Sequence, residues 1–499
     1  MRQRAVLLAL IVATVAGVGF TFVDGGPVGD GATRPTTTAM APDRPNIVLI
    51  LTDDMRTDEL QYMPSTRRLL ADQGTSYTSA ISPHPMCCPA RAELVTGQYA
   101  QNNGVKHNLG PFGGVHALRH PNDNIGVWMQ DAGYRTGYHG KFLNGYSRAF
   151  GRVAGWNVWD PIVAGTTYLY WRSVWFDGDS YHHRYITHVT AERTKSMLDT
   201  LDRGSAPFFM VVNHTAPHAR TGDVVKKPAY EPRYGRLFDH LQPDFTRKPS
   251  YFAKDPALPH DLYDRSFDRK DELVRARARA RALRSVDDDV RLLVHQLAAA
   301  GELDDTYIVF TSDNGFVLGE HGLHGKNLMI DESLDVPLIV RGPGIPAGAV
   351  NRTPVTLVDL AATFLHWGHA VPSAARPSDG LPITEPAALA RRDTILVQAG
   401  DSSRADHGWW YRGVDTRRYL YAVHPRDPSV GVLFDRERDP FAMRDVLHDP
   451  AYAPVRRELA HRLAVLEHCS GESCNRVFGP VPDPLPQPKK GRAAEPERR

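Results

Sequence analysis

Two apolar segments that end in polar side chains constrain the fold of this chain more than any other feature. Residues 46–54 read Asn-Ile-Val-Leu-Ile-Leu-Thr-Asp-Asp, and residues 306–315 read Thr-Tyr-Ile-Val-Phe-Thr-Ser-Asp-Asn-Gly. Continuous apolar runs of this kind are typical of strands in a parallel sheet that is buried on both faces. The sequence therefore predicts an α/β fold in which both strands deliver oxygen-bearing side chains to the edge of the sheet where ligands bind.

A short cysteine segment lies between these strands in the sequence. Residues 87–91 read Cys-Cys-Pro-Ala-Arg, and residues 94–97 read Leu-Val-Thr-Gly. A cysteine followed by proline two residues later and by arginine four residues later resembles the signature of type I sulfatases, whose first cysteine is oxidised to formylglycine. An isolated motif would also fit two small apolar cysteines ahead of a proline-opened helix. The two acid-bearing strands, in the order expected of the family, argue against that alternative.

The resemblance implies a chemical role for residue 87. The aldehyde of formylglycine would be hydrated to a geminal diol, whose first hydroxyl attacks sulfur and whose second hydroxyl later expels the sulfate. Covalent catalysis would thus divide one difficult displacement into two easier steps. Arg91 would hold the diol and the charge around it, and a formylglycine-generating enzyme would be a partner during maturation of Cys87.

The resemblance also implies a metal site. Three carboxylates and an amide favour a hard cation over zinc, which prefers histidine and cysteine ligands. Calcium is expected from the family, with magnesium as the alternative. Either strand alone would fit a strand that runs into an Asp/Asn turn, which is common. The implied ligands are Asp53, Asp54, Cys87 as formylglycine, Asp313 and Asn314.

A lysine after a glycine-rich segment is the first expected sulfate-binding cation. Residues 133–141 read Gly-Tyr-Arg-Thr-Gly-Tyr-His-Gly-Lys and resemble the family segment whose lysine contacts formylglycine and sulfate. Many arylsulfatases carry histidine two residues further, where this chain has Leu143. Gly-Lys-Phe-Leu-Asn and the double cysteine resemble the N-acetylglucosamine-6-sulfatase branch instead. His139 could replace the missing histidine, but a histidine in a surface loop is the alternative interpretation.

Two further segments resemble family elements that contact the substrate. An apolar run at 207–213 leads into Thr-Ala-Pro-His, so that His218 is the expected proton donor to the leaving alcohol. Its alternative is a loop histidine bonded to a backbone carbonyl. Residues 319–326 read Gly-Glu-His-Gly-Leu-His-Gly-Lys, in which Lys326 matches the second sulfate-binding lysine. His321 is expected to line the pocket, because too few further ligands are present for zinc.

The amino terminus and the cysteines indicate an exported protein. Residues 1–23 carry two arginines and an apolar stretch, which predicts a signal peptide or a retained membrane anchor, and residues 24–44 resemble a linker. Cys469 and Cys474 would suit a small disulfide loop outside the cytosol. The formal charge of +2, from 59 basic and 57 acidic residues, gives no global attraction to nucleic acid.

The remaining pattern predicts two structural parts. A catalytic domain is expected over 45–370, with a helix over 271–303 and long loops over 150–270. Short strands between 394 and 434 and a helix over 455–467 predict a smaller antiparallel subdomain over 371–480. Residues 481–499 are rich in proline and charge, which predicts a disordered tail.

These observations predict an alkaline-phosphatase-like sandwich with a large mixed, mostly parallel sheet. The expected activity is hydrolysis of a sulfate ester on a sulfated sugar or a related monoester. One alternative is a phosphodiester or phosphonate hydrolase of the same superfamily. Another is a noncatalytic protein that binds sulfated glycans and keeps Cys87 unmodified.

Overall fold

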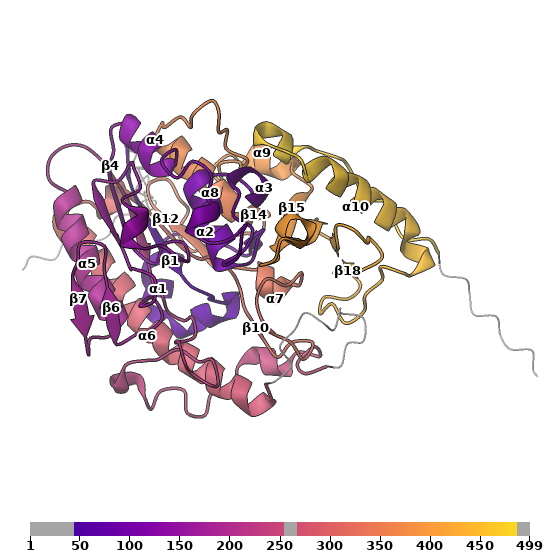
Figure 1. Cartoon of the computed structure of the whole chain (residues 1–499), viewed down its shortest axis with the longest axis horizontal. Helices are drawn as coiled ribbons and strands as arrows, with labels where there is room; N and C mark the ends of the chain where they lie inside the picture. Colours follow the sequence, from indigo (N-terminus) through magenta and orange to yellow (C-terminus); the bar gives the residue numbers. More distant parts are fainter. Residues whose placement is uncertain (1–43, 254–266, 487–499) are drawn as a thin grey trace, which may run out of the picture. The chain divides into compact units, whose positions relative to one another are not determined.

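The computed structural model describes residues 44–253 and 267–486 (Figure 1). The predicted signal peptide or anchor at 1–23 and the linker up to residue 43 lie outside the described residues. Within the described ranges, no helix combines the length and the apolar character that a membrane crossing requires. The predicted tail lies outside them from residue 487, whereas the Leu485 N–H donates to the Ala451 carbonyl at 2.8 Å, so the ordered chain continues past 480.

An eight-stranded sheet forms the centre of the fold, in the order β13-β2-β12-β9-β1-β8-β4-β5. β1 pairs in parallel with both β9 and β8, while β12 runs antiparallel between β9 and β2. The predicted mixed, mostly parallel sheet is therefore confirmed. Its strands are β1 Asn46–Thr52, β2 Thr75–Tyr77, β4 Arg135–Gly140, β5 Val158–Pro161, β8 Phe208–Asn213, β9 Thr306–Ser312, β12 Leu338–Arg341 and β13 Ala349–Asn351.

Helices cover both faces of this sheet, which explains why its central strands are apolar throughout. Alternate residues of β1 enter different cores, because successive side chains of a strand point to opposite faces. Ile47 and Leu49 pack with α2, α4 and α8, whereas Val48 and Ile50 pack with α5 and α6. Figure 1 shows these two helix groups on opposite sides of β1. The helices are α1 Pro64–Thr66, α2 Cys87–Thr96, α3 Ala100–Asn103, α4 Ile125–Asp131, α5 Ile186–Leu201, α6 Arg269–Ala300, α7 Asp331–Leu334, α8 Leu357–Trp367, α9 Pro386–Arg391 and α10 Ala453–Leu466.

The expectation of long loops throughout 150–270 is wrong for part of that segment. It contains the 16-residue helix α5, which packs beside α6 and on β8. The buried positions Ile186, Val189 and Met197 have helical spacing and form the face turned to the sheet. Threonines between them weaken the apolar pattern, because β-branched polar residues are poor helix formers.

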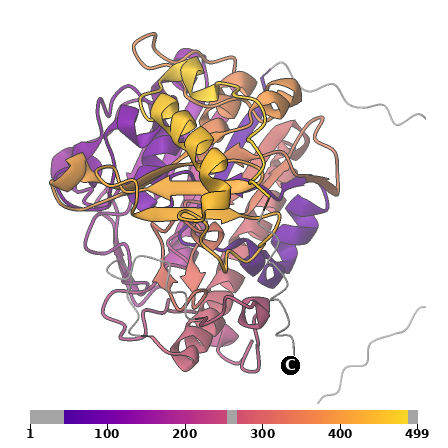
Figure 2. The same cartoon turned by 90° about the vertical axis from the view of Figure 1, so that its right-hand side faces the viewer.

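A second sheet packs against the first part of the chain from the carboxyl-terminal side. Its four antiparallel strands are β15 Ile395–Gly400, β16 Trp409–Asp415, β17 Tyr419–Val423 and β18 Gly431–Asp435. One face packs under α10, which crosses the strands in Figure 2. The other face packs on Val317, Leu323 and Leu328. The sheet thus supports the segment that contains Lys326.

Shorter elements complete the described fold. Cys469 and Cys474 are joined by a disulfide, at the end of α10. Small strand pairs connect loops rather than layers. They are β3 Ala80–Ile81 with β14 Val355–Thr356, β6 Arg172–Val174 with β7 Ser180–His182, and β10 Val317–Leu318 with β11 His324–Gly325.

A buried ion pair between Asp359 and Arg392 stabilises the position of α8, which packs against α2. Asp359 accepts from the Thr356 N–H at 2.7 Å, in a capping box, and from the Leu381 N–H at 2.8 Å. The Arg392 guanidinium binds both of its carboxylate oxygens, at 2.8 and 2.6 Å. Both side chains are buried. This arrangement connects the first turn of α8 with the segment that precedes β15.

We expect Asp359→Ala to lower the free energy of unfolding by about 3–5 kcal/mol, because the buried Arg392 charge loses its partner. Urea unfolding followed by tryptophan fluorescence measures this change. The double variant Asp359→Ala/Arg392→Met is the matched control, and it should recover part of the loss because no buried charge remains. A single variant within about 1 kcal/mol of wild type would contradict the assigned role of the pair.

Candidate active site

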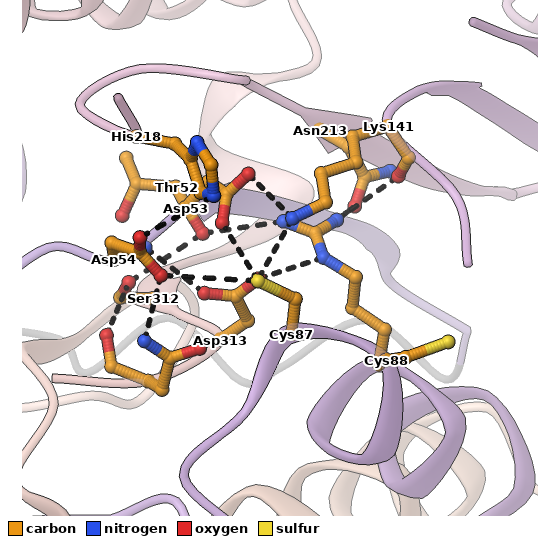
Figure 3. A network of polar contacts seen from close by, with 12 residues as sticks. Thr52, Asp53, Asp54, Cys87, Cys88, Lys141, Asn213, His218, Ser312 and Asp313 are labelled. Atoms are coloured by element: carbon orange, nitrogen blue, oxygen red, sulfur yellow. Dashed lines mark hydrogen bonds and ion pairs between the residues drawn. The ribbon is translucent and has the colours of Figure 1, made fainter. Parts of the chain in front are cut away.

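The register of two parallel strands brings the predicted acidic residues together. Thr52 pairs with Ser312, so Asp53 and Asp313, the next residue on each strand, lie side by side at the carboxyl end of the sheet. The Asp54 N–H donates to Asp313 Oδ1 at 3.0 Å. Figure 3 shows these carboxylates gathered around Cys87, which begins α2.

The two cysteines of the motif have different surroundings. Cys87 Sγ lies 3.2 Å from Asp53 Oδ1, 3.8 Å from Asp54 Oδ1 and 2.6 Å from Lys326 Nζ. Cys88 packs in the hydrophobic core, and its sulfur points away from the polar network in Figure 3. The buried-cysteine interpretation therefore describes Cys88, whereas Cys87 has a polar environment.

Three cations balance the three carboxylates. Lys141 Nζ lies 2.5 Å from Asp53 Oδ2 and 3.6 Å from Asp313 Oδ2. The Arg91 guanidinium donates to Asp313 Oδ2 at 2.8 Å, and Lys326 contacts Asp54. The acids and Lys141 and Arg91 are almost completely buried. Each charge thus has an opposite charge within contact, which makes burial of the cluster tolerable.

The charges set the protonation of the acids. Burial by itself raises the pKa of Asp53 and of Asp54, but the nearby cations, first Lys141 for Asp53 and first Lys326 for Asp54, lower both below their usual range. Burial and the Asp53 charge raise the pKa of Asp313. Burial and Asp53 also raise the pKa of the Cys87 thiol. An unmodified Cys87 would therefore be a protonated and weak nucleophile.

The donor set fits a hard divalent cation. Ligand atoms of Asp53, Asp54, Cys87 and His218 all lie within 4.8 Å of one another. Asn314 Oδ1 is buried and accepts no hydrogen bond from the described residues, while its amide nitrogen donates to Asp54 Oδ1 at 2.8 Å. A cation would satisfy this oxygen and reduce the repulsion among the carboxylates. The cluster contains Asp53, Asp54 and Cys87 of the sequence-based ligand set, and its oxygen donors suit a hard cation such as calcium or magnesium. That Asp313 and Asn314 are also ligands stays a prediction.

His218 faces this cluster from a loop after β8. Its ring stacks on Tyr168 with centroids 4.0 Å apart, and Nδ1 lies 2.7 Å from the Ala219 carbonyl. A carbonyl can only accept, so Nδ1 carries the proton and Nε2 faces Asp54 Oδ2 at 3.7 Å. Burial lowers the pKa of His218 below its usual value, and the opposing effect of Asp53 and Asp54 does not restore it. The carbonyl bond expected in the alternative interpretation is present and orients the ring toward the cluster, while the role of His218 as proton donor stays a prediction.

The other histidines lie elsewhere. His139 is neither a surface residue nor part of the network, because it is buried in β4 and its Nε2 contacts Thr194 Oγ1 at 3.0 Å. His321 is buried, and its N–H donates to the Ser250 carbonyl at 2.6 Å. Its role in lining the pocket stays a prediction. Leu143 is buried in the hydrophobic core.

Sequence reasoning missed two residues that contact the network. Asn213 ends β8, accepts from Arg91 at 3.0 Å and donates to the His139 carbonyl at 3.0 Å. Its position at the carboxyl end of a buried strand was a usable signal. Tyr168 stacks on His218, and Lys141 Nζ lies 5.3 Å from its ring centroid. No sequence pattern marks Tyr168, since it lies in a region of short strands and loops.

A separate cavity of about 840 Å³ lies between α7 and the carboxyl-terminal sheet. Its walls include Asp335, Arg352, Asp415 and Arg436, and none of the predicted site residues is among its lining residues. The volume of this cavity therefore does not identify the site, whereas the convergence of charged side chains indicates the polar network around Cys87.

Comparison with known proteins identifies the family. A sulfatase family model matches residues 45–370, and the model of the N-sulphoglucosamine sulphohydrolase C-terminal region matches residues 319–468. The chain therefore belongs to the sulfatase family. This result confirms the resemblance found in the sequence.

Individual relatives are more distant. Human N-acetylglucosamine-6-sulfatase is 33% identical over 351 residues, which cover 64% of this chain and 60% of that protein. The extracellular sulfatase SULF-1 homolog of Drosophila melanogaster is 33% identical over 344 residues, which cover 65% of this chain and only 30% of that protein. The chain thus spans well under two thirds of the length of these relatives.

A solved structure shows the same fold. The structure of BT4656 with its substrate D-glucosamine-2-N,6-O-disulfate aligns with a TM-score of 0.68 at 21% identity, over 84% of this chain and 97% of that one. The predicted alkaline-phosphatase-like fold is confirmed by this likeness and by the observed sheet.

We expect Lys326→Met to make stability more dependent on a divalent cation. The substitution removes the ammonium that contacts Asp54 and Cys87, so the acids repel one another until a metal ion replaces it. Thermal scans with EDTA and with calcium should show a calcium-induced rise in Tm that is larger than in wild type, by on the order of 2 °C.

The control is Lys248→Met, because Lys248 pairs with Glu332 outside the network at 2.7 Å. Its calcium-induced shift should equal that of wild type. Equal shifts in all three proteins would show that Lys326 does not compensate for a metal ion.

Proposed function

We propose that this protein is a sulfuric ester hydrolase that removes sulfate from a sulfated sugar, with formylglycine at position 87 and a divalent cation, calcium by family resemblance. The observation that carries the proposal is the position of Cys87 Sγ within contact of Asp53, Asp54 and Lys326, while Cys88 lies in the core. Membership of the sulfatase family and relatives named N-acetylglucosamine-6-sulfatase support it.

The proposed ligands of the cation are Asp53, Asp54, Asp313, Asn314 and residue 87. A bound cation would polarise the sulfate oxygens and offset their charge. Lys141 and Lys326 would contact the sulfate from two sides, because both ammonium groups already lie among the carboxylates. Arg91 would fix Asp313 and the first turn of α2. These residues would form a site for the singly charged sulfate group of the ester.

Residue 87 would provide the nucleophile as a formylglycine diol. One hydroxyl would lose its proton to a neighbouring carboxylate of the network as its oxygen forms a bond to sulfur and the bond between sulfur and the sugar oxygen breaks. The departing alkoxide would take a proton from Nε2 of His218 in its imidazolium form, because Nδ1 carries the single proton of the neutral ring. Loss of a proton from the second hydroxyl would then re-form the aldehyde and release sulfate. Water adds to the aldehyde and restores the diol.

We also propose export of the protein and a catalytic domain at 45–370 followed by a subdomain at 371–480. The extracellular sulfatases among the relatives and the amino-terminal sequence support export. A formylglycine-generating enzyme is the proposed maturation partner, and a 6-sulfated N-acetylglucosamine unit is the proposed substrate. Retention of the amino-terminal segment as a membrane anchor is the alternative to its cleavage.

In active protein, the peptide that contains residue 87 should be about 18 Da lighter than its thiol form, because an aldehyde replaces the thiol-bearing carbon. Mass spectrometry measures this change. Cys87→Ala should abolish turnover, whereas the matched variant Cys88→Ala should retain most of it. An active enzyme with an intact Cys87 thiol would exclude the proposed nucleophile. An intact thiol together with no turnover would instead support the noncatalytic glycan-binding alternative.

His218→Ala should slow hydrolysis of 6-sulfated N-acetylglucosamine by about a hundredfold or more, and hydrolysis of nitrophenyl sulfate much less. A sugar alkoxide needs a proton as it leaves, but a nitrophenolate does not. Values of kcat/KM for both esters measure the difference. His188→Ala is the control, since His188 is exposed and contacts Glu231 away from the network. Equal losses on both esters would assign His218 to sulfate binding instead.

The same assay separates sulfate from phosphorus chemistry. If the protein is a sulfatase, its kcat/KM should be higher for nitrophenyl sulfate than for the matched nitrophenyl phosphonate or phosphodiester. A reversed preference would support the superfamily alternative of a phosphodiester or phosphonate hydrolase.

A further inference from the structure

We propose that Arg279, on α6, is a positioning residue that holds the turn after β1 in the shape in which the Asp54 carboxylate faces the metal site. This inference rests on the proposed function, because it assigns a role toward the proposed cation. Arg279 lies far from residues 53–54 in the sequence and does not contact the Asp54 carboxylate in any described interaction.

Asp54 has a backbone conformation that needs support. Its φ angle is +69°, in the left-handed region that side chains other than glycine rarely adopt. Aspartate tolerates this region better than most residues, but the conformation still costs conformational free energy. Such a conformation persists where surrounding contacts determine it. With the turn in this shape, the Asp54 carboxylate points into the network (Figure 3).

Arg279 makes the contacts that determine the turn. One guanidinium nitrogen, Nη2, donates to the Asp54 carbonyl. Nε and Nη2 also bind the two Glu59 carboxylate oxygens, both at 2.6 Å. Glu59 in turn accepts from the Arg56 N–H at 3.0 Å. The planar guanidinium therefore fixes the turn at residues 54 and 56 together, a geometry that lysine cannot reproduce.

The same contacts reach the second ligand-bearing turn. The Arg279 guanidinium carbon lies 5.0 Å from the centre of the Phe316 ring, two residues after Asn314. Arg56 Nη1 donates to the Phe316 carbonyl at 2.7 Å. Asp54 itself donates to Asp313 at 3.0 Å. Arg279 is thus at the junction of the two turns that carry all four proposed aspartate and asparagine ligands.

The charge of Arg279 is compatible with a neighbouring cation. Glu59 neutralises the guanidinium through two bonds, so little net positive charge is directed at the metal site. Arg279 binds the carbonyl of Asp54 and leaves its carboxylate oxygens to the network. These two facts distinguish a positioning residue from a metal ligand and from a sulfate-binding cation.

The test compares Arg279→Gln with Arg275→Gln. Arg275 lies one turn earlier on α6, is equally buried, and pairs with Glu272 while donating to the carbonyl of Lys226 at 3.2 Å. Calcium affinity of the full chain is measured by competition with a fluorescent chelator after EDTA treatment. We expect Arg279→Gln to raise Kd about 10–100-fold, as for outer partners of metal ligands, and Arg275→Gln to change it by less than about twofold.

A second readout separates positioning from a general loss of structure. At saturating calcium, kcat of Arg279→Gln should return to within about threefold of wild type, because the bound ion then holds the turn. Arg279→Lys keeps the charge but not the planar guanidinium, so it should show a Kd between those of wild type and Arg279→Gln. It replaces the glutamine variant in the test if that variant does not fold.

Specific outcomes overturn the inference. If a folded Arg279→Gln variant binds calcium with the wild-type Kd, the inference about Arg279 is wrong and the proposed function is unaffected. The same holds if Arg275→Gln loses as much calcium affinity as Arg279→Gln. If the wild-type protein binds no divalent cation, the proposed metal site is wrong, and the inference about Arg279 is overturned with it. The calcium affinity of the wild-type protein therefore shows which of the two proposals has failed.

Discussion

Balance of buried charge is the constraint on which the site depends. Asp53, Asp54 and Asp313 are brought together by the parallel register of β1 and β9, and three isolated carboxylates could not be buried there. The cations that offset them come from α2, from the end of β4 and from the segment after β11. The site is complete only when these distant parts of the chain have packed around the same edge of the sheet.

The sequence predicted those elements whose signal is local. The apolar runs at 46–52 and 306–312 are readable because parallel strands covered on both faces must be apolar throughout. The acids after them, Cys87 and Lys141 also stand in short segments with recognisable spacing. α5 was missed because threonines interrupt its apolar positions, although its buried face has helical spacing.

Other features depend on contacts between residues far apart in the sequence. The arginine-rich first half of α6 resembles a solvated helix face, yet Arg275 and Arg279 are buried. Burial of an arginine depends on a partner such as Glu59, and no local pattern shows that this partner is near. Tyr168 is similar, because its stacking on His218 arises from the packing of two loops.

The carboxyl-terminal sheet has a consequence for biosynthesis. A nascent chain that has emerged as far as Asp313, directly after β9, already contains every acid of the site, but the strands that pack on residues 317–334 are synthesised later. Until β15–β18 form, the segment that carries Lys326 lacks its packing partner, and the acids lack one of their counter-charges. A ribosomal product that stops before these strands would therefore retain its acids as unbalanced charge, a property that quality-control proteases could use to remove it.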